Sequence, residues 1–230
     1  MANRAYLYSL SNRPRSYADR PERIVGLSEW GWQVPLSYRV LMSGSPQICA
    51  SLAASGLESD AGGAKTKLHA ISSDFQTGYA RLEKLAAAVR HVAARSVPGL
   101  DADLTSTFAF LESHRDEFLL LETIELDMVT ETDEEGLRAC VEREVAACLQ
   151  TGSAVDALPA DPAEAGARLL TATRSRGEPP WDAFHGLRLD ENYDAVRETD
   201  YPLGLYWEDV LYFALWNRAE FIANGLVPDP

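Results

Sequence analysis

The chain has few of the residues that build metal centres and disulfide frameworks, with three cysteines and four histidines among 230 residues. Cys49, Cys140 and Cys148 are odd in number, which is typical of free thiols in a reducing compartment. No two histidines stand three to five residues apart, the spacing of a helical zinc pair, and no secretory signal precedes the first alternating segment. We therefore predict no metal, no cofactor and a cytoplasmic location.

Long hydrophobic runs are also missing, because no apolar stretch approaches the roughly 18 residues of a membrane-spanning helix. The hydrophobic share of 46% and the charged share of 24% are those of a folded globular protein. A chain of this length forms one ordinary domain or two small ones. We predict one α+β domain over residues 1–230, predominantly helical with a small β-sheet, and the small polar stretch 151–160 is the candidate internal linker.

Basic side chains are the scarcer kind of charge, with 21 Lys and Arg against 35 Asp and Glu and a net charge of −14. Residues 1–100 hold 12 basic and 7 acidic side chains, whereas residues 101–230 hold 9 basic and 28 acidic ones. Within the second part, residues 101–150 carry a net charge of −11. A surface of this sign repels nucleic acid and attracts a basic partner. Acidity that serves solubility alone is the alternative.

Periodicity and capping residues place the expected elements along the chain. Alternation of Tyr6, Tyr8 and Leu10 predicts a strand, Ser45-Pro46 predicts a helix start, and Thr132 with Glu135 predicts a capping box. The resulting strands are 5–11, 67–72 and 119–129. The resulting helices are 36–43, 46–54, 75–95, 101–114, 133–149 with a stop at Gly152, 161–175 and 207–224.

The last predicted helix, 207–224, has apolar residues around most of its circumference. Such a helix is either central to the core or shared with a partner. A homodimer joined through this helix is therefore one of the functional alternatives.

Catalytic chemistry finds weak support in the sequence. Glu122 and Glu125 form a carboxylate pair near a predicted strand, and His114 precedes Asp116, which suits acid–base work. No serine has the spacing of a nucleophile elbow. We assign no catalytic residue, and a small cytosolic hydrolase that uses Glu122, Glu125 or His114 stays open as an alternative.

The opening Met-Ala-Asn-Arg-Ala-Tyr-Leu-Tyr-Ser, together with Leu27-Ser-Glu-Trp30, the segment 35–44 and Ala70-Ile-Ser-Ser-Asp74, resembles a family of uncharacterised bacterial proteins that begin in the same way. The resemblance implies no particular activity and no site residue. An acidic, compact bacterial protein without catalytic motifs is similar in general character to the immunity proteins that neutralise polymorphic toxins, which is an analogy of class.

These observations predict a binding protein that is more consistent with an inhibitor than with an enzyme. The expected partner is a basic protein such as a bacterial toxin or effector, which must present positive charge to a polyanionic substrate. The predicted partner-binding residues are the acids that cluster between positions 122 and 135: Glu122, Glu125, Asp127, Glu131, Asp133, Glu134 and Glu135.

Overall fold

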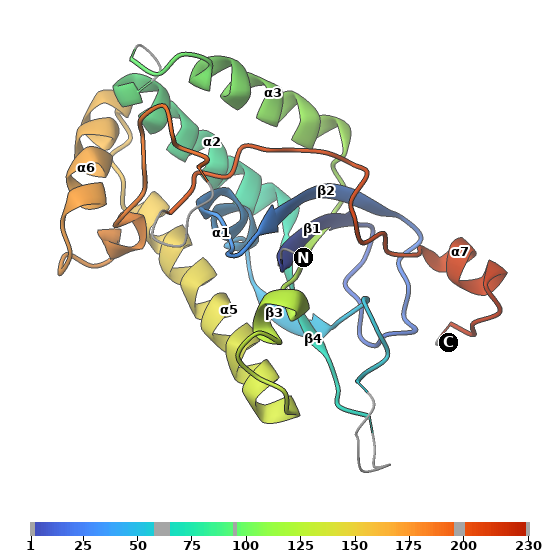
Figure 1. Ribbon diagram of the computed structural model, residues 1–230. Helices are drawn as coiled ribbons and strands as arrows, with labels where there is room; N and C mark the ends of the chain where they lie inside the picture. Colours follow the sequence, from blue (N-terminus) through green and yellow to red (C-terminus); the bar gives the residue numbers. More distant parts are fainter. Residues whose placement is uncertain (1–2, 58–64, 94–95, 196–200, 229–230) are drawn as a thin grey trace.

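A five-stranded antiparallel sheet lies at the centre of the computed structural model, which describes residues 3–57, 65–93, 96–195 and 201–228 (Figure 1). The strand order is β2-β1-β5-β4-β3. Two strands from distant parts of the sequence, β1 and β5, are neighbours near the middle. The strands are β1 (Arg4–Leu10), β2 (Ile24–Gly31), β3 (Gln47–Ala50), β4 (His69–Asp74) and β5 (Phe118–Glu122).

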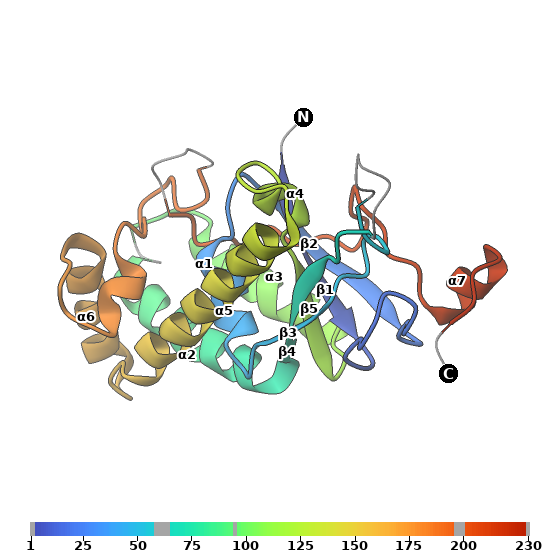
Figure 2. The ribbon, with the colours of Figure 1, turned by 90° about the horizontal axis from the view of Figure 1, so that it is seen from below.

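Most helices cover one face of this sheet. Figure 2 shows α2, α5 and α6 on one side and α7 on the other. The fold is α+β and predominantly helical, as the sequence predicted. The helices are α1 (Leu36–Met42), α2 (Phe75–Ala93), α3 (Leu100–Ser113), α4 (Ile124–Asp127), α5 (Glu134–Asp156), α6 (Pro162–Arg174), the 3-10 turn η1 (Trp181–Phe184) and α7 (Arg218–Ala223). Of the predicted helix 75–95, positions 94–95 lie outside the described residues.

Alternation along β1 divides the core into two layers. Leu7 points with Leu121 into the larger core beneath the helices. Tyr6 and Tyr8 point the other way, into a smaller core that includes Leu120. The period of two that marked this strand in the sequence therefore serves two buried faces rather than one.

The second face of the sheet is covered by the C-terminal chain rather than by a helix. Leu211 and Leu215 are buried in the smaller core, whereas Tyr212 and Trp216 are exposed. Backbone groups bind β2 directly, since the Glu208 N–H donates to the carbonyl of Leu27 over 3.0 Å. Further along, the Tyr212 N–H donates to the Glu29 carboxylate of β2 over 2.6 Å, and the Phe213 carbonyl accepts from the Tyr8 hydroxyl of β1 over 2.5 Å. The prediction of a helix over 207–224 was wrong except for α7 at its end, because these backbone groups bond to residues of the sheet.

Two further predictions of secondary structure were wrong, because contacts between distant segments decide the conformation there. The segment 46–54, predicted as a helix, contains the edge strand β3, which pairs with β4 in the register Ile48↔Ile71. The segment 119–129, predicted as one strand, leaves the sheet at Glu122 and turns into α4. The strand β2 had no predicted counterpart.

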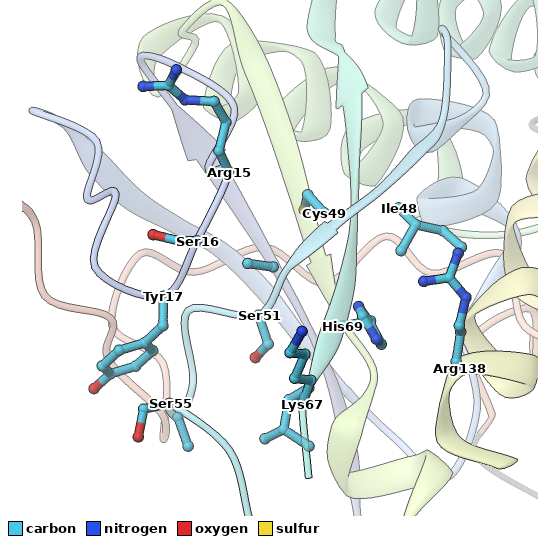
Figure 3. Close-up of a pocket in the computed structure, with 13 residues that line it drawn as sticks. Arg15, Ser16, Tyr17, Ile48, Cys49, Ser51, Ser55, Lys67, His69 and Arg138 are labelled. Carbon is cyan, nitrogen blue, oxygen red and sulfur yellow. The ribbon is translucent and has the colours of Figure 1, made fainter. Parts of the chain in front are cut away.

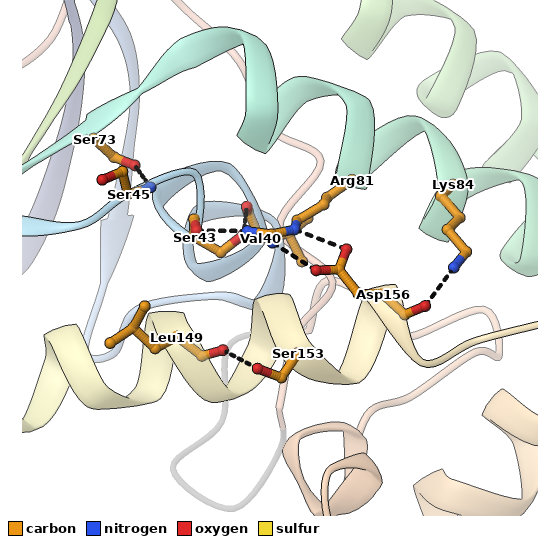
Figure 4. Close-up of polar contacts among 9 residues, drawn as sticks. All are labelled: Val40, Ser43, Ser45, Ser73, Arg81, Lys84, Leu149, Ser153 and Asp156. Atoms are coloured by element: carbon orange, nitrogen blue, oxygen red, sulfur yellow. Dashed lines mark hydrogen bonds and ion pairs between the residues drawn. The ribbon is translucent and has the colours of Figure 1, made fainter.

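The candidate linker 151–160 is also wrong, because α5 continues to Asp156. Figure 4 shows why this end is fixed: the Arg81 guanidinium on α2 donates to the Asp156 carboxylate, at 2.9 Å for its Nε, and to the carbonyl of Ser43 over 2.6 Å. A Cβ on Gly152 would lie 2.7 Å from that of Ser43. Gly152 therefore permits close packing within the helix and does not end it.

Candidate functional site

The predicted acidic cluster lies at the corner where β5 ends and α5 begins, and Figure 2 shows α4 at this end of the sheet. The chain makes a short turn because the backbone N–H groups of Leu126 and Asp127 both donate to the carbonyl of Thr123. Asp133 then caps α5 by accepting from the Gly136 N–H over 2.8 Å. We call residues 125–135 the acidic corner.

Six of the seven predicted partner-binding acids belong to the acidic corner. Asp133, Glu134 and Glu135 are exposed, and Glu125, Asp127 and Glu131 are half-buried. These carboxylates lie along one short stretch of chain, from α4 through the connecting segment to the first turn of α5.

Two of the half-buried acids also have structural roles. Glu125 accepts from the backbone N–H of Arg4 over 3.1 Å and from the Tyr6 hydroxyl over 2.8 Å, which ties α4 to β1. Asp127 accepts from the Thr123 hydroxyl over 2.7 Å. Burial raises the pKa of Asp127 to about 6, and the nearby Glu144 adds to the shift. The outward charge of the corner therefore rests mainly on Glu131, Asp133, Glu134 and Glu135.

The seventh acid, Glu122, is a correction to the sequence prediction, because it is only 1% exposed and cannot meet a partner at the surface. Its carboxylate accepts from the Ser51 hydroxyl over 2.8 Å and from the Leu52 N–H over 2.7 Å. Burial raises the pKa of Glu122 to about 7, although these hydrogen bonds and the charge of Arg20 oppose the shift. Glu122 therefore anchors the loop after β3.

Two exposed apolar side chains at the centre of the acidic corner were not singled out from the sequence. Met128 is 46% exposed and Val129 is 62% exposed, on the turn between Asp127 and Glu131. The predicted strand 119–129 contains Met128, whose side chain would then face a core. Their exposure follows from the early end of β5, and no periodic signal indicates it.

The candidate hydrolytic residues are held by different partners. Glu122 binds the loop after β3, Glu125 binds β1, and the Nδ1 atom of His114 lies 2.9 Å from the carbonyl of Phe110 on its own helix. The Nε2 atom of His114 lies 3.7 Å from the Asp209 carboxylate. No group of three or more His, Cys, Asp or Glu arranged to hold a metal occurs among the described residues.

The cysteines are free thiols in the part of the chain that the structure describes. Cys140 and Cys148 are buried on α5, and Cys49 lies on β3. Burial raises the pKa of Cys49 to about 12, with the charge of Glu122 adding to the shift, so this thiol is protonated at neutral pH.

Fold and site together define an acidic α+β protein with an apolar pair set among carboxylates. A protein family described as "Domain of unknown function (DUF7822)" matches residues 11–171, and the chain belongs to this family. No curated protein and no solved structure matches the chain. In the described ranges, no helix is both long enough and apolar enough to span a membrane.

Proposed function

We propose that this chain is a cytoplasmic binding protein that inhibits a basic protein partner, in the manner of a bacterial immunity protein, and that the acidic corner is its binding surface. The observation that carries the proposal is the exposed pair Met128 and Val129 within a run of carboxylates. Protein interfaces combine an apolar centre, in which Met is enriched, with a polar rim. The corner has this composition.

Charge explains why the partner is basic. The exposed carboxylates Asp133, Glu134 and Glu135 follow one another on the first turn of α5 and its cap. A concentrated negative potential raises the association rate of a cationic protein by roughly 10- to 1,000-fold and makes that rate sensitive to salt. An enzyme that acts on a polyanion must itself present positive charge, so a toxin nuclease is the partner class that this surface suits.

Kinetics of charge-reversed variants test the proposal. The variant Glu131→Lys/Glu134→Lys/Glu135→Lys changes the corner and keeps the Asp133 cap. The matched control Glu83→Lys/Glu164→Lys/Glu191→Lys changes net charge equally at exposed positions elsewhere. A partner captured with the parent protein is produced separately, and association is measured at two salt concentrations. We expect the corner variant alone to associate about tenfold or more slowly at low salt.

The apolar pair has a separate readout. Met128→Ser/Val129→Ser removes the apolar centre without changing charge, so we expect faster dissociation at an unchanged association rate. Cells that produce the partner should be protected by the parent protein and less well by this variant. If the corner variant and its matched control associate at the same rate, the acidic corner is not the binding surface.

A further inference from the structure

A cavity of about 500 Å³ opens beside the edge strand β3 (Figure 3). It adjoins the acidic corner, because the backbone N–H of its lining residue Lys67 donates to the Glu134 carboxylate over 3.3 Å. We call it the β3-edge pocket. Its walls come from the N-terminal loop before β2, from β3 with the loop that follows it, from the start of β4 and from α5. The lining residues are Arg15, Ser16, Tyr17, Ile48, Cys49, Ala50, Ser51, Ala54, Ser55, Lys67, Leu68, His69 and Arg138.

Among the residues that the structure describes, the lining contains basic side chains and no carboxylate, although acids outnumber bases in the chain. Figure 3 shows Lys67 and His69 between Tyr17 on one side and Arg138 on the other. The carboxylate that pairs with Arg138, at 2.9 Å, is that of Glu142, which is not part of the lining. In a protein of net charge −14, such a lining requires an explanation.

The imidazole of His69 has an unsatisfied hydrogen-bonding atom. Its Nε2 atom is buried and has no hydrogen-bond partner in the described ranges. Burial and then the charge of Arg138 lower the pKa of His69, and Lys67 acts in the same direction, whereas Glu134 opposes it. The imidazole is therefore neutral at pH 7, and a bound oxygen atom would satisfy its unpaired nitrogen.

The size and the remaining walls define the ligand further. Ile48, Ala50, Ala54 and Leu68 give the pocket apolar surface, and Ser16, Tyr17 and Ser55 supply hydroxyl groups. Cavities of roughly 300–1,000 Å³ that combine apolar walls with a few convergent polar groups are typical of small-molecule sites. Arg and Lys are the usual partners of phosphate and carboxylate groups.

We propose that the β3-edge pocket binds a small organic anion, in which a phosphate or carboxylate group contacts Lys67, Arg138 and His69 while an apolar body rests on Ile48 and Ala50, which lie on the same face of the sheet as His69. The geometry of the pocket carries this inference, which does not depend on the function of the acidic corner. A protein with both features is a binding protein with a second, small-molecule site.

Titration with simple probes tests the proposal on the full chain. Phenyl phosphate, benzoate, phenol and inorganic phosphate are each added to the protein, and binding is followed by calorimetry and by shifts of backbone amide NMR signals. We expect phenyl phosphate or benzoate to shift signals of β3 and β4. Whichever of these two probes binds more tightly identifies the preferred oxyanion. That probe should bind at least about tenfold more tightly than phenol and than inorganic phosphate, because it contacts both the basic and the apolar side chains of the lining.

Variants place the binding in this pocket. Lys67→Ala and Arg138→Ala should each weaken binding of the tighter probe about tenfold. The control Arg90→Ala removes an arginine that pairs with Asp101 outside the pocket, at 2.9 Å, and should leave binding unchanged. Lys67 is exposed, so Lys67→Ala keeps the fold, which a thermal melt verifies. The proposal would be overturned by equal binding of phenol and phenyl phosphate, by unchanged affinity in both pocket variants, or by the failure of both phenyl phosphate and benzoate to bind.

Discussion

Glu122 has a different role in the structure from the one that the sequence predicted. In the sequence it is one more member of an acidic run, but its place at the end of β5 puts it against the loop after β3. Arg20, another buried charged residue, is 4% exposed, and its guanidinium lies against the rings of Tyr17 and Phe221, at 4.3 and 4.5 Å from their centres. Neither burial has a signal in the spacing of charges, because both depend on contacts over long sequence distances.

The first prediction concerns the protonation of Glu122. Its pKa is about 7 in the folded protein and 4.5 ordinarily, so the folded state retains a proton that the unfolded chain releases. The resulting stabilisation is fully present below pH 4.5 and is lost as the pH rises through 7. Because one pKa unit corresponds to about 1.4 kcal/mol, Glu122→Gln should gain about 1 to 3 kcal/mol relative to the parent between pH 5 and pH 8.

Urea unfolding of both proteins at the two pH values measures this difference. Glu135→Gln, at an exposed position, is the control and should show no such change. A parent protein that becomes more stable relative to Glu122→Gln as the pH rises would mean that Glu122 is ionised and favourably paired in the fold.

At the scale of elements, apolar spacing and capping residues predicted the helices that depend mainly on neighbouring residues. The long helices α2 and α6 follow from apolar spacing and from the Asp161 cap, which accepts from the Ala163 and Glu164 N–H groups. The sequence failed where pairing decides: β3 has a helix-start signature but pairs with β4. Along Leu211–Trp216 buried and exposed side chains alternate, which is the period of two of an extended chain. The sequence did not reveal this alternation, because the exposed positions also carry apolar residues.

The site was predicted in the same uneven way. The acidic run is contiguous, so six of its members stay together on the acidic corner wherever the turn falls. The β3-edge pocket draws its walls from four separate segments, and the position of Lys67 beside Arg138 depends on how α5 packs against β3 and β4. No spacing of residues in the sequence predicts a pocket that is built from segments so far apart.

The second prediction concerns the contact between α1 and α2. A Cβ on Gly78 would lie 1.8 Å from the carbonyl oxygen of Leu41, which is backbone and cannot turn aside. We expect Gly78→Ala to destabilise the protein by about 1 to 3 kcal/mol, despite the better helix propensity of alanine. At Gly136, in the first turn of α5, the nearest atom is instead the end of the Glu131 side chain, at 2.5 Å.

Gly136→Ala is therefore the matched control, and its helix propensity should leave stability unchanged or raise it by up to about 1 kcal/mol. Thermal melts of the two variants beside the parent decide the comparison. Equal melting temperatures for both variants would show that α1 and α2 separate readily to admit the methyl group.

At the scale of the whole molecule, the charge asymmetry of the sequence has a second use besides attraction of a partner. Arginines of the basic first part pair with carboxylates of the acidic second part: Arg39 with Glu144 at 2.7 Å, Arg81 with Asp156 and Arg90 with Asp101. The two parts therefore associate within the fold. The acidic excess that remains exposed, at the acidic corner among other places, is what a partner meets.

The last prediction concerns the part of the chain that the family match covers, residues 11–171. That span lacks β1, which pairs with both β2 and β5, so β2 would lose its partner strand. It also lacks Leu211 and Leu215, which cover the second face of the sheet. We expect a fragment of residues 11–171 to melt without cooperativity, because a sheet that loses its central pairing also loses the surface on which α1 and α2 pack.

A fragment of residues 1–171 restores β1 and should recover part of the helical signal while binding a hydrophobic dye at the uncovered face. Circular dichroism melts of both fragments beside the full chain measure this order. A cooperative melt of fragment 11–171 at the temperature of the full chain would instead make β1 and the C-terminal chain accessories to a core that folds without them.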